Sequence, residues 1–320
     1  MANKRILVTG GTGFLGSALV RHLIRVGHSV RVLDDDSRGN VGRLEDVAAD
    51  FEFVSGDVRN PEAVQRATKG MDAVAHLAFV NGTEFFYQKP ELVLEIAVKG
   101  AMNTLEAALA EGVEEYYLMS SSEVYQDPPT IPTDESAPFS IPDPLNPRYS
   151  YAGGKIISEL LAINYGRQRF RRLVIVRPHN AYGPNMGKEH VIPQFAKRIG
   201  EAARQQAAGA LPLTIQGDGS QTRAFIYVDD FTEGCALAFL HGEHMGIYHV
   251  GSEEEITIAT IARKVAEGFG RELDLHFGPP APGGTPRRCP NTAKLRALGF
   301  APKVSLDEGI RRTVAWYAQR

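Results

Sequence analysis

The chain has 320 residues, of which 43% are hydrophobic and 23% are charged, with a formal net charge of -3 at pH 7. These values are ordinary for a globular protein, and the length predicts about two domains, or one large unit with a lobe attached. The weak negative charge provides no basic field, so neither nucleic acid nor an anionic membrane is expected as a partner. No apolar run approaches the roughly 18 residues that span a bilayer.

The two cysteines, Cys235 and Cys289, lie far apart and outside any metal-type spacing. We therefore expect neither a disulfide framework nor a metal site, which fits a reducing compartment. The first residues lead directly into an apolar strand and leave no room for a signal peptide. A cytoplasmic protein is expected.

The first motif is a glycine-rich turn, TGGTGFLG, between a strand predicted at 6–8 and a helix predicted at 17–26. Gly10 permits a tight turn, Gly13 lets the backbone approach a pyrophosphate, and Gly16 lets helix and strand pack closely. The free N–H groups of the helix N-terminus suit phosphate. This variant of the dinucleotide fingerprint predicts five cofactor contacts, namely Gly10, Gly13, Phe14, Leu15 and Gly16.

Asp34 ends the second predicted strand, 29–33, where dinucleotide-binding folds place an acidic residue on the ribose hydroxyls. A carboxylate there repels the 2′-phosphate of NADP, so we expect NAD, and Arg38 leaves NADP open as the alternative. Strands predicted at 51–54 and 73–77 also end in residues placed to contact the cofactor, namely Asp57 and Val58 near the adenine and Leu77 and Ala78 beneath the dinucleotide. His76, inside an apolar strand, is interpreted as a core residue.

Residues 119–125 read MSSSEVY and follow an apolar run, 115–119, that predicts a buried parallel strand. Their hydroxyls and carboxylate would lie at the C-terminal end of that strand, where open α/β sheets bind ligands. Tyr151 and Lys155 begin a helix at i and i+4, so their side chains share one face. The ammonium is expected to lower the pKa of the phenol and make it a base toward a substrate alcohol, with the Ser121 hydroxyl opposite.

Strands and helices alternate through the first part of the chain, which predicts an α/β fold with a Rossmann-type, doubly wound parallel sheet. The second part has no dinucleotide fingerprint and is expected to form a smaller α/β substrate lobe. We assign 1–178 to the dinucleotide-binding domain, with 224–250 returning to it, and 179–223 and 251–320 to the lobe. Within these parts, Asp229 and Asp230 are expected to cap a helix, and the Pro/Gly-rich stretch 278–290 carries Arg287 and Arg288.

Together these motifs resemble the extended short-chain dehydrogenase/reductases that modify nucleotide sugars, and the resemblance runs nearly end to end. It implies that Tyr151 is the base toward the sugar 4-hydroxyl. It further implies that Lys155 holds Tyr151 and the nicotinamide ribose, while Ser121 shares a hydrogen bond with the same hydroxyl. The implied substrate is a nucleotide-diphosphate sugar, and its expected contacts are Ser122, Asn180, Arg223 and Arg288.

Glu123 separates the reactions that can follow oxidation at C4. The dehydratases of this group have a hydroxyl–x–Glu triplet whose Glu removes the C5 proton, and Ser121-Ser122-Glu123 matches it. We therefore expect a 4,6-dehydratase or another enzyme that acts at C5. One alternative is a 4-epimerase using Ser121, Tyr151 and Lys155 alone. Others are a nucleotide uronic acid decarboxylase, which has a similar triplet and an arginine near the substrate carboxylate, and a protein that binds NAD without chemistry.

Two positions depart from the family pattern. Ala97 stands where members often have Asn, and Gln126 stands where they commonly have Gly after Val-Tyr. Many relatives dimerise through helices that correspond to 91–110 and 151–165, so a homodimer is expected. The apolar face of the first helix would be supplied by Ala101, Leu105 and Ala108.

Overall fold

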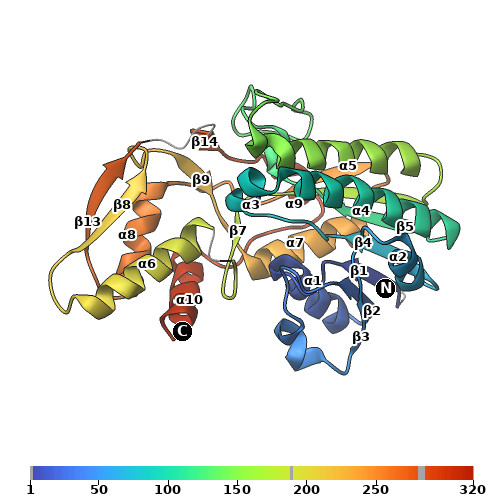
Figure 1. Cartoon of the computed structure of the whole chain (residues 1–320), viewed down its shortest axis with the longest axis horizontal. Helices are drawn as coiled ribbons and strands as arrows, with labels where there is room; N and C mark the ends of the chain where they lie inside the picture. The colour runs from blue at the N-terminus through green and yellow to red at the C-terminus, as the bar shows by residue number, and fades with distance from the viewer. Residues whose placement is uncertain (1–2, 188–189, 280–284, 320) are drawn as a thin grey trace.

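The computed structural model describes residues 3–187, 190–279 and 285–319. Its largest element is a seven-stranded sheet in the order β11-β6-β5-β4-β1-β2-β3, with all neighbouring strands parallel (Figure 1). This confirms the predicted doubly wound α/β fold. The strands are β1 (Arg5–Thr9), β2 (Ser29–Asp34), β3 (Phe51–Ser55), β4 (Ala73–His76), β5 (Glu115–Met119), β6 (Arg172–Pro178) and β11 (Gly246–Val250).

Helices cover both faces of this sheet, and successive strand residues point to opposite faces. Ile6 and Val8 belong to the core formed with α1 and α7, whereas Leu7 between them packs into the core formed with α2, α4 and α5. Because both faces are buried, the central strands are continuous apolar runs. The helices are α1 (Phe14–Arg25), α2 (Pro61–Thr68), α4 (Pro90–Ala110), α5 (Ser150–Gly166) and α7 (Val228–His241).

A smaller lobe with its own core lies beside the sheet (Figure 1). It contains α6 (Val191–Gln205), α8 (Ile258–Gly268), α10 (Leu306–Ala318) and the parallel pair β8 (Leu211–Gln216) and β13 (Leu273–Gly278). Ile199, Leu213 and Val265 are buried where these elements meet. The expected α/β lobe is therefore present, and the residue limits given above for the two domains stay a prediction.

Short elements connect the sheet and the lobe and surround the edge where the strands end. They are η1 (Val41–Val47), α3 (Thr83–Gln88), η2 (Ser122–Val124), η3 (Pro147–Tyr149), β7 (Ala181–Tyr182), β9 (Thr222–Ala224), β10 (Ile226–Tyr227), β12 (Glu255–Thr257), β14 (Arg287–Arg288) and α9 (Ala293–Arg296). The Pro/Gly-rich stretch 278–290 is described at 278–279 and 285–290, where Arg287 and Arg288 form β14, and its remainder lies outside the described residues. Across the described segments, no helix is both long and apolar enough to cross a membrane.

Two expectations about helices are wrong. Asp229 and Asp230 do not cap α7, which begins at Val228 without a side-chain cap bond. Asp230 instead accepts the backbone N–H groups of Lys303 at 3.0 Å and Val304 at 2.8 Å, and so fixes the segment before α10.

The second wrong expectation concerns the dimer face. Ala101, Leu105 and Ala108 are each 0% exposed inside the chain. They cannot meet a second subunit, because α4 needs this apolar face to cover its own sheet.

Candidate active site

A cavity of about 410 Å³ runs along the carboxyl ends of the central strands. Among the described residues, Arg223 is the one predicted site residue that does not line it. The others do, namely Gly10, Gly13, Phe14, Leu15, Gly16, Asp34, Asp57, Val58, Leu77, Ala78, Ser121, Ser122, Glu123, Tyr151, Lys155, Asn180 and Arg288. The fold thus brings residues from many parts of the chain to one sheet edge, as expected for a doubly wound sheet.

The glycine turn fits close approach of a ligand to the backbone. Gly10 has φ +72°, and a Cβ on it would lie 2.7 Å from the Cα of Ala78. A Cβ on Gly16 would lie 2.0 Å from the carbonyl oxygen of Gly10. A side chain at either position would fill this cradle. Because both residues are glycine, the turn and the N-terminus of α1 stay open for a pyrophosphate.

Asp34 lies at the same end of the cavity. Its two carboxylate oxygens accept the N–H groups of Thr12 and Asp36, each at 3.0 Å. Burial raises the pKa of Asp34, and these hydrogen bonds oppose the increase. The carboxylate is therefore held by the turn after β1 and faces a cavity suited to ribose hydroxyls.

The cavity also includes the two other predicted cofactor segments. Leu77 and Ala78 follow β4, and their N–H groups donate to Thr9 Oγ1, each at 3.2 Å. Asp57 pairs with Arg59 at 2.6 Å, which lowers the pKa of that carboxyl. His76 is buried and bonds Thr9 at 2.8 Å, and burial lowers its pKa to about 3, as suits a neutral core histidine.

Tyr151 and Lys155 lie one turn apart on α5, both buried. Lys155 Nζ donates to the carbonyl oxygen of Met119 at 2.8 Å and lies 3.8 Å from the centroid of the Phe79 ring. Phe79 and Phe86 pack around the Tyr151 ring, with centroids 5.0 and 4.9 Å away. Two aromatic rings therefore shield the phenol and the ammonium from water.

The expectation that Lys155 lowers the pKa of the phenol is wrong for this structure. Burial raises the pKa of Tyr151 to about 12, and a hydrogen bond with Ser121 offsets this only in part. Burial also lowers the pKa of Lys155 to about 7, with Glu159 opposing the change. Near neutral pH the lysine therefore carries only part of its positive charge. Its effect on the pKa of Tyr151 is smaller than that of burial, which removes water from around the phenol and raises this pKa.

Glu123 lies at the other side of Tyr151 and is paired with Arg288, Oε1 to Nη1, at 2.5 Å. Its side chain is 27% exposed and that of Arg288 is 7% exposed. Burial alone would raise the pKa of Glu123, but Arg288 outweighs it and the pKa falls to about 2. The carboxylate is thus ionised at neutral pH and is a weak base.

Gln126 also holds Glu123. Its Nε2 donates to the carbonyl oxygen of Glu123 at 2.6 Å and to Oε2 at 3.2 Å. Gln126 has φ +53°, a left-handed conformation that favours glycine. This conformation is consistent with the glycine expected at this position from the family pattern. In this chain the two hydrogen bonds from the Gln126 side-chain amide to Glu123 offset the less favourable backbone conformation.

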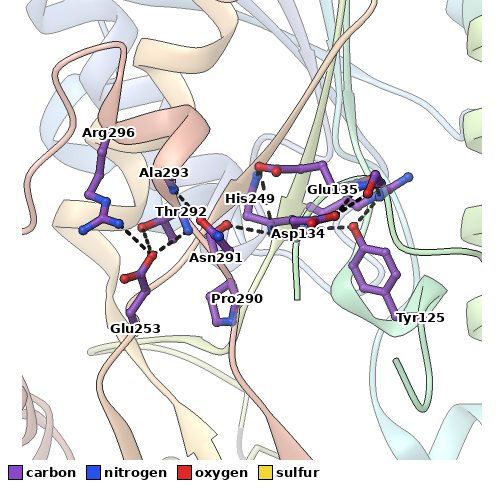
Figure 2. A network of polar contacts seen from close by, with 12 residues as sticks. Tyr125, Asp134, Glu135, His249, Glu253, Pro290, Asn291, Thr292, Ala293 and Arg296 are labelled. Carbon is purple, nitrogen blue, oxygen red and sulfur yellow. Dashed lines mark hydrogen bonds and ion pairs between the residues drawn. The ribbon is translucent and has the colours of Figure 1, made fainter. Parts of the chain in front are cut away.

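A network of polar contacts around His249 lies close in the chain to the Glu123–Arg288 pair (Figure 2). Tyr125 bonds His249 Nε2 at 2.6 Å, and His249 Nδ1 lies 3.2 Å from the carbonyl oxygen of Asn291. Farther along, Glu253 accepts the N–H of Thr292 at 2.7 Å and its hydroxyl at 2.9 Å. The network joins the segment after β5, which contains Glu123, to the segment that follows β14, the strand that contains Arg288.

Asn180 and Arg223 are two other predicted substrate contacts, and Arg223 is the register partner of Arg288 between β9 and β14. Asn180 lines the cavity, and its Nδ2 donates to the carbonyl oxygen of Ala224 at 3.0 Å. Arg223 donates to the carbonyl oxygens of Thr222 and Thr285 at 2.7 and 2.8 Å. Burial, together with the charge of Arg288, lowers the pKa of Arg223 to about 10. Their contacts with a diphosphate stay predictions.

Several lining residues were absent from the sequence prediction, among them Phe79, Phe86 and Arg148. Phe79 follows the end of β4 and Phe86 lies in the short helix α3, and no motif marks either as a neighbour of Tyr151. Arg148 precedes Tyr151 by three residues, and this short spacing could have predicted that Arg148 lies near the site. Arginine in a proline-rich loop is nonetheless ordinary at a protein surface.

A parallel sheet, a glycine cradle at its edge and a Tyr–Lys pair with a nearby hydroxyl define a dinucleotide-dependent enzyme of the short-chain dehydrogenase/reductase type. Residues 6–251 match the model of the NAD dependent epimerase/dehydratase family. The chain belongs to this family, and the predicted cofactor, NAD, is confirmed.

Relatives in the family differ in their reactions. The chain is 32% identical to UDP-glucuronic acid decarboxylase 1 of Arabidopsis thaliana over 99% of its own length and 70% of that protein. Its fold matches the dTDP-glucose 4,6-dehydratase DesIV of Streptomyces venezuelae, solved with NAD bound, with a TM-score of 0.87 and 32% identity over 98% and 97% of the two chains. It also matches UDP-glucose 4-epimerase of Thermus thermophilus in complex with NAD, with a TM-score of 0.85 and 32% identity over 98% of each chain.

Proposed function

We propose that this enzyme oxidises C4 of a nucleotide-diphosphate sugar and then releases CO₂ from C5, so that its substrate is a nucleotide uronic acid. One observation carries the proposal: the base candidate Tyr151 and an ionised, arginine-paired Glu123 lie at one end of the same cavity. Oxidation at C4 followed by return of the hydride to C4 does not require Glu123. The presence of Glu123 therefore points to chemistry at the neighbouring carbon, C5.

The first step uses Tyr151 and Ser121. Tyr151 takes the proton of the C4 hydroxyl, and Ser121, which bonds the phenol, holds that hydroxyl in place. When bound, NAD supplies the acceptor and later the donor of the C4 hydride, and its positive charge favours the phenolate of Tyr151. Lys155 keeps the end of α5 fixed through its bond to Met119. The residues that would hold NAD are those of the glycine cradle together with Asp34.

The second step favours decarboxylation over dehydration. A ketone at C4 makes the C5 carboxylate a β-keto acid, so breaking the C5–C6 bond releases CO₂ and leaves its electron pair in an enolate. The Tyr151 and Ser121 hydroxyls can donate to the enolate oxygen, and a water molecule held by the Glu123–Arg288 pair supplies the proton that C5 takes up. Dehydration instead requires a base strong enough to remove the C5 proton. Glu123, with a pKa of about 2, is poorly suited to that role.

Dehydration at C5 and C6 is the second candidate, because Ser121-Ser122-Glu123 matches the hydroxyl–x–Glu triplet expected for it. The fold match to DesIV also supports it. The two candidates differ in what leaves the sugar, so product mass separates them. Epimerisation at C4 would leave the mass unchanged.

The test is incubation of the enzyme and NAD with a panel of nucleotide sugars, both neutral and uronic, followed by mass spectrometry. Loss of CO₂ from a uronic acid supports the proposal, whereas loss of water from a neutral sugar or an unchanged mass contradicts it. Glu123→Gln is expected to retain NADH formation, whereas its rate of CO₂ release from C5 should fall by about 10²-fold or more. Asp127→Asn, an exposed neighbour outside the cavity lining, is the matched control.

We also propose a homodimer formed through α4 and α5. Exposed apolar side chains remain on these two helices, with Leu94 at 38%, Ile157 at 38% and Leu160 at 46% exposure. Leu160→Glu is expected to produce a monomer in light scattering. Leu145→Glu, at a site 90% exposed on a loop, is the control and leaves the mass unchanged.

A further inference from the structure

We propose that Arg148 binds the carboxylate of the sugar and makes the site select a uronic acid over the matching neutral sugar. The inference rests on the proposed function, because it names the residue that would recognise the acid group. It begins from an arginine that the motifs did not mark and that lines the active-site cavity.

The position of Arg148 is fixed by the local chain. It lies in η3, and the side chain of Asn146 accepts its backbone N–H at 3.0 Å. The helix α5 begins at Ser150, so the same short turn sets both Arg148 and the first-turn residue Tyr151. A substrate with C4 at the phenol therefore has its neighbouring substituents within the region that Arg148 lines.

Arg148 differs from the other two arginines near this end of the cavity. Arg288 is engaged by Glu123 and also donates to Thr285 Oγ1 at 3.1 Å. Arg223 donates to two backbone carbonyl oxygens. Within the part of the chain that the structure describes, the Arg148 guanidinium has no hydrogen-bond or ion-pair partner, and its Nε is buried and unsatisfied. A part-buried guanidinium that makes no direct hydrogen bond or ion pair favours an anionic ligand.

The charges at this end of the cavity favour an anionic ligand. Arg148 and Arg288 both lower the pKa of Glu123 against the effect of burial, Arg288 the more strongly. Arg223 also interacts electrostatically with these three groups. Three positive charges therefore face one negative charge, and anionic groups of the substrate would neutralise the two that remain. Of the three arginines, Arg148 is the one whose guanidinium makes no hydrogen bond within the described residues, which leaves it to a sugar carboxylate. The planar guanidinium can also bind both oxygens of a carboxylate at once, which a neutral hydroxymethyl group cannot match.

The alternative anion is the diphosphate, for which the resemblance implies Arg223 and Arg288 as contacts, with Asn180 on the diphosphate or the sugar. Arg148 instead lies three residues before Tyr151, the residue expected to face C4 of the sugar. We therefore assign it to the sugar end. The experiment measures both ligand parts separately.

The test uses the NAD-loaded protein and calorimetric titration with paired ligands: the glucuronate and glucose forms of uridine, thymidine, guanosine and cytidine diphosphate sugars, and each nucleoside diphosphate alone. The wild type is expected to bind one uronate about 10- to 100-fold more tightly than its neutral partner, as for a hydrogen bond to a charged group. Arg148→Met is expected to abolish the preference for the uronate and to leave the affinity for the nucleoside diphosphate unchanged. Arg148→Lys is expected to retain part of that preference. Arg169→Met, at an exposed position, is the control.

Three results would overturn the inference: no uronate preference in the wild type, a preference that survives Arg148→Met, or an equal loss for the nucleoside diphosphate alone, which would place Arg148 on the diphosphate. Because the ratio is a binding measurement, it is independent of turnover. A uronate preference without CO₂ release contradicts the proposed function alone, and CO₂ release with an unchanged ratio in Arg148→Met contradicts this inference alone. Unaltered thermal unfolding and NAD binding establish that the variant is folded.

Discussion

The two ends of the active-site cavity are built in different ways. The cofactor end is made mainly of backbone from one continuous strand–turn–helix, in which Gly10 and Gly16 leave the space. The sugar end is made of side chains from separate segments, namely Glu123 after β5, Arg148 and Tyr151 around the start of α5, and Arg288 on β14.

This difference separates what is general from what is particular. A backbone cradle suits the ligand that members of the family share, the NAD cofactor, and it tolerates little change because a Cβ on Gly10 or Gly16 would meet main-chain atoms. Side chains that converge from distant segments can be exchanged one at a time while the fold is kept. The sugar end is therefore where relatives with one fold can perform decarboxylation, dehydration or epimerisation.

The largest effect is expected from Tyr151→Phe at the sugar end. Removal of the hydroxyl eliminates the base for C4 oxidation, so NADH formation with substrate should fall by about 10²–10⁴-fold. Affinity for NAD should stay near the wild-type value, because the cradle is untouched. Tyr149→Phe, two residues earlier and also buried, is the control. Loss of NAD binding in Tyr151→Phe would show that the two ends are not separable.

At the cofactor end, Gly16→Ala is expected to cost about 1–3 kcal/mol of unfolding free energy, because its Cβ would lie 2.0 Å from the Gly10 carbonyl oxygen. NAD affinity should fall at least about tenfold as the turn shifts. Gly153→Ala is the matched control, since no atom lies within 4 Å of its added Cβ, and it should be neutral or slightly stabilising. Urea unfolding and NAD titration measure both quantities. Wild-type values for Gly16→Ala would mean that the close approach is unimportant.

A pH experiment addresses the Glu123–Arg288 pair. The pKa of Glu123 falls from an ordinary 4.5 to about 2 on folding. The pair therefore stabilises the protein fully above the unfolded value, and this contribution is lost as the pH falls toward the folded value. The difference in unfolding free energy between wild type and Glu123→Gln should shrink between pH 4.5 and 2, as measured by urea unfolding. A difference independent of pH in this window would contradict the ion pair.

The smallest effect is expected from Gln126→Gly. Glycine relieves a left-handed backbone that costs other residues roughly 1–2 kcal/mol, but the change removes two bonds to Glu123, each contributing about 0.5–1.5 kcal/mol. Stability should therefore change by less than about 1 kcal/mol. The stabilisation that ionised Glu123 contributes should begin to fall at the same pH as in the wild type, which the unfolded state sets, but the loss should be complete at a higher pH, because the folded-state pKa of Glu123 is less depressed. An unchanged acid profile would show that the amide does not hold Glu123.

Much of this protein was accessible from local patterns. The glycine turn, Asp34 and the Tyr151–Lys155 spacing each lie within a few residues, and apolar runs separated by helices imply a parallel sheet. Expectations failed where a competing effect was not local. Lys155 was expected to lower the pKa of Tyr151, yet Phe79 and Phe86 bury both groups and reverse the sign. Likewise, Ala101 and its neighbours are apolar because they cover the sheet, and sequence alone cannot separate that role from a dimer face.

By itself, the sequence determined the fold class, the family and the cofactor, because periodicity, turn chemistry and short motifs act between residues that are close along the chain. The tertiary structure decided which charges meet. Glu123 and Arg288 are far apart in sequence and form an ion pair only because β14 is fixed beside the segment after β5. The same packing leaves the buried Nε of Arg148 without a hydrogen-bond partner among the described residues. Electrostatic effects depend on distance and burial, and both are set only when the chain has folded.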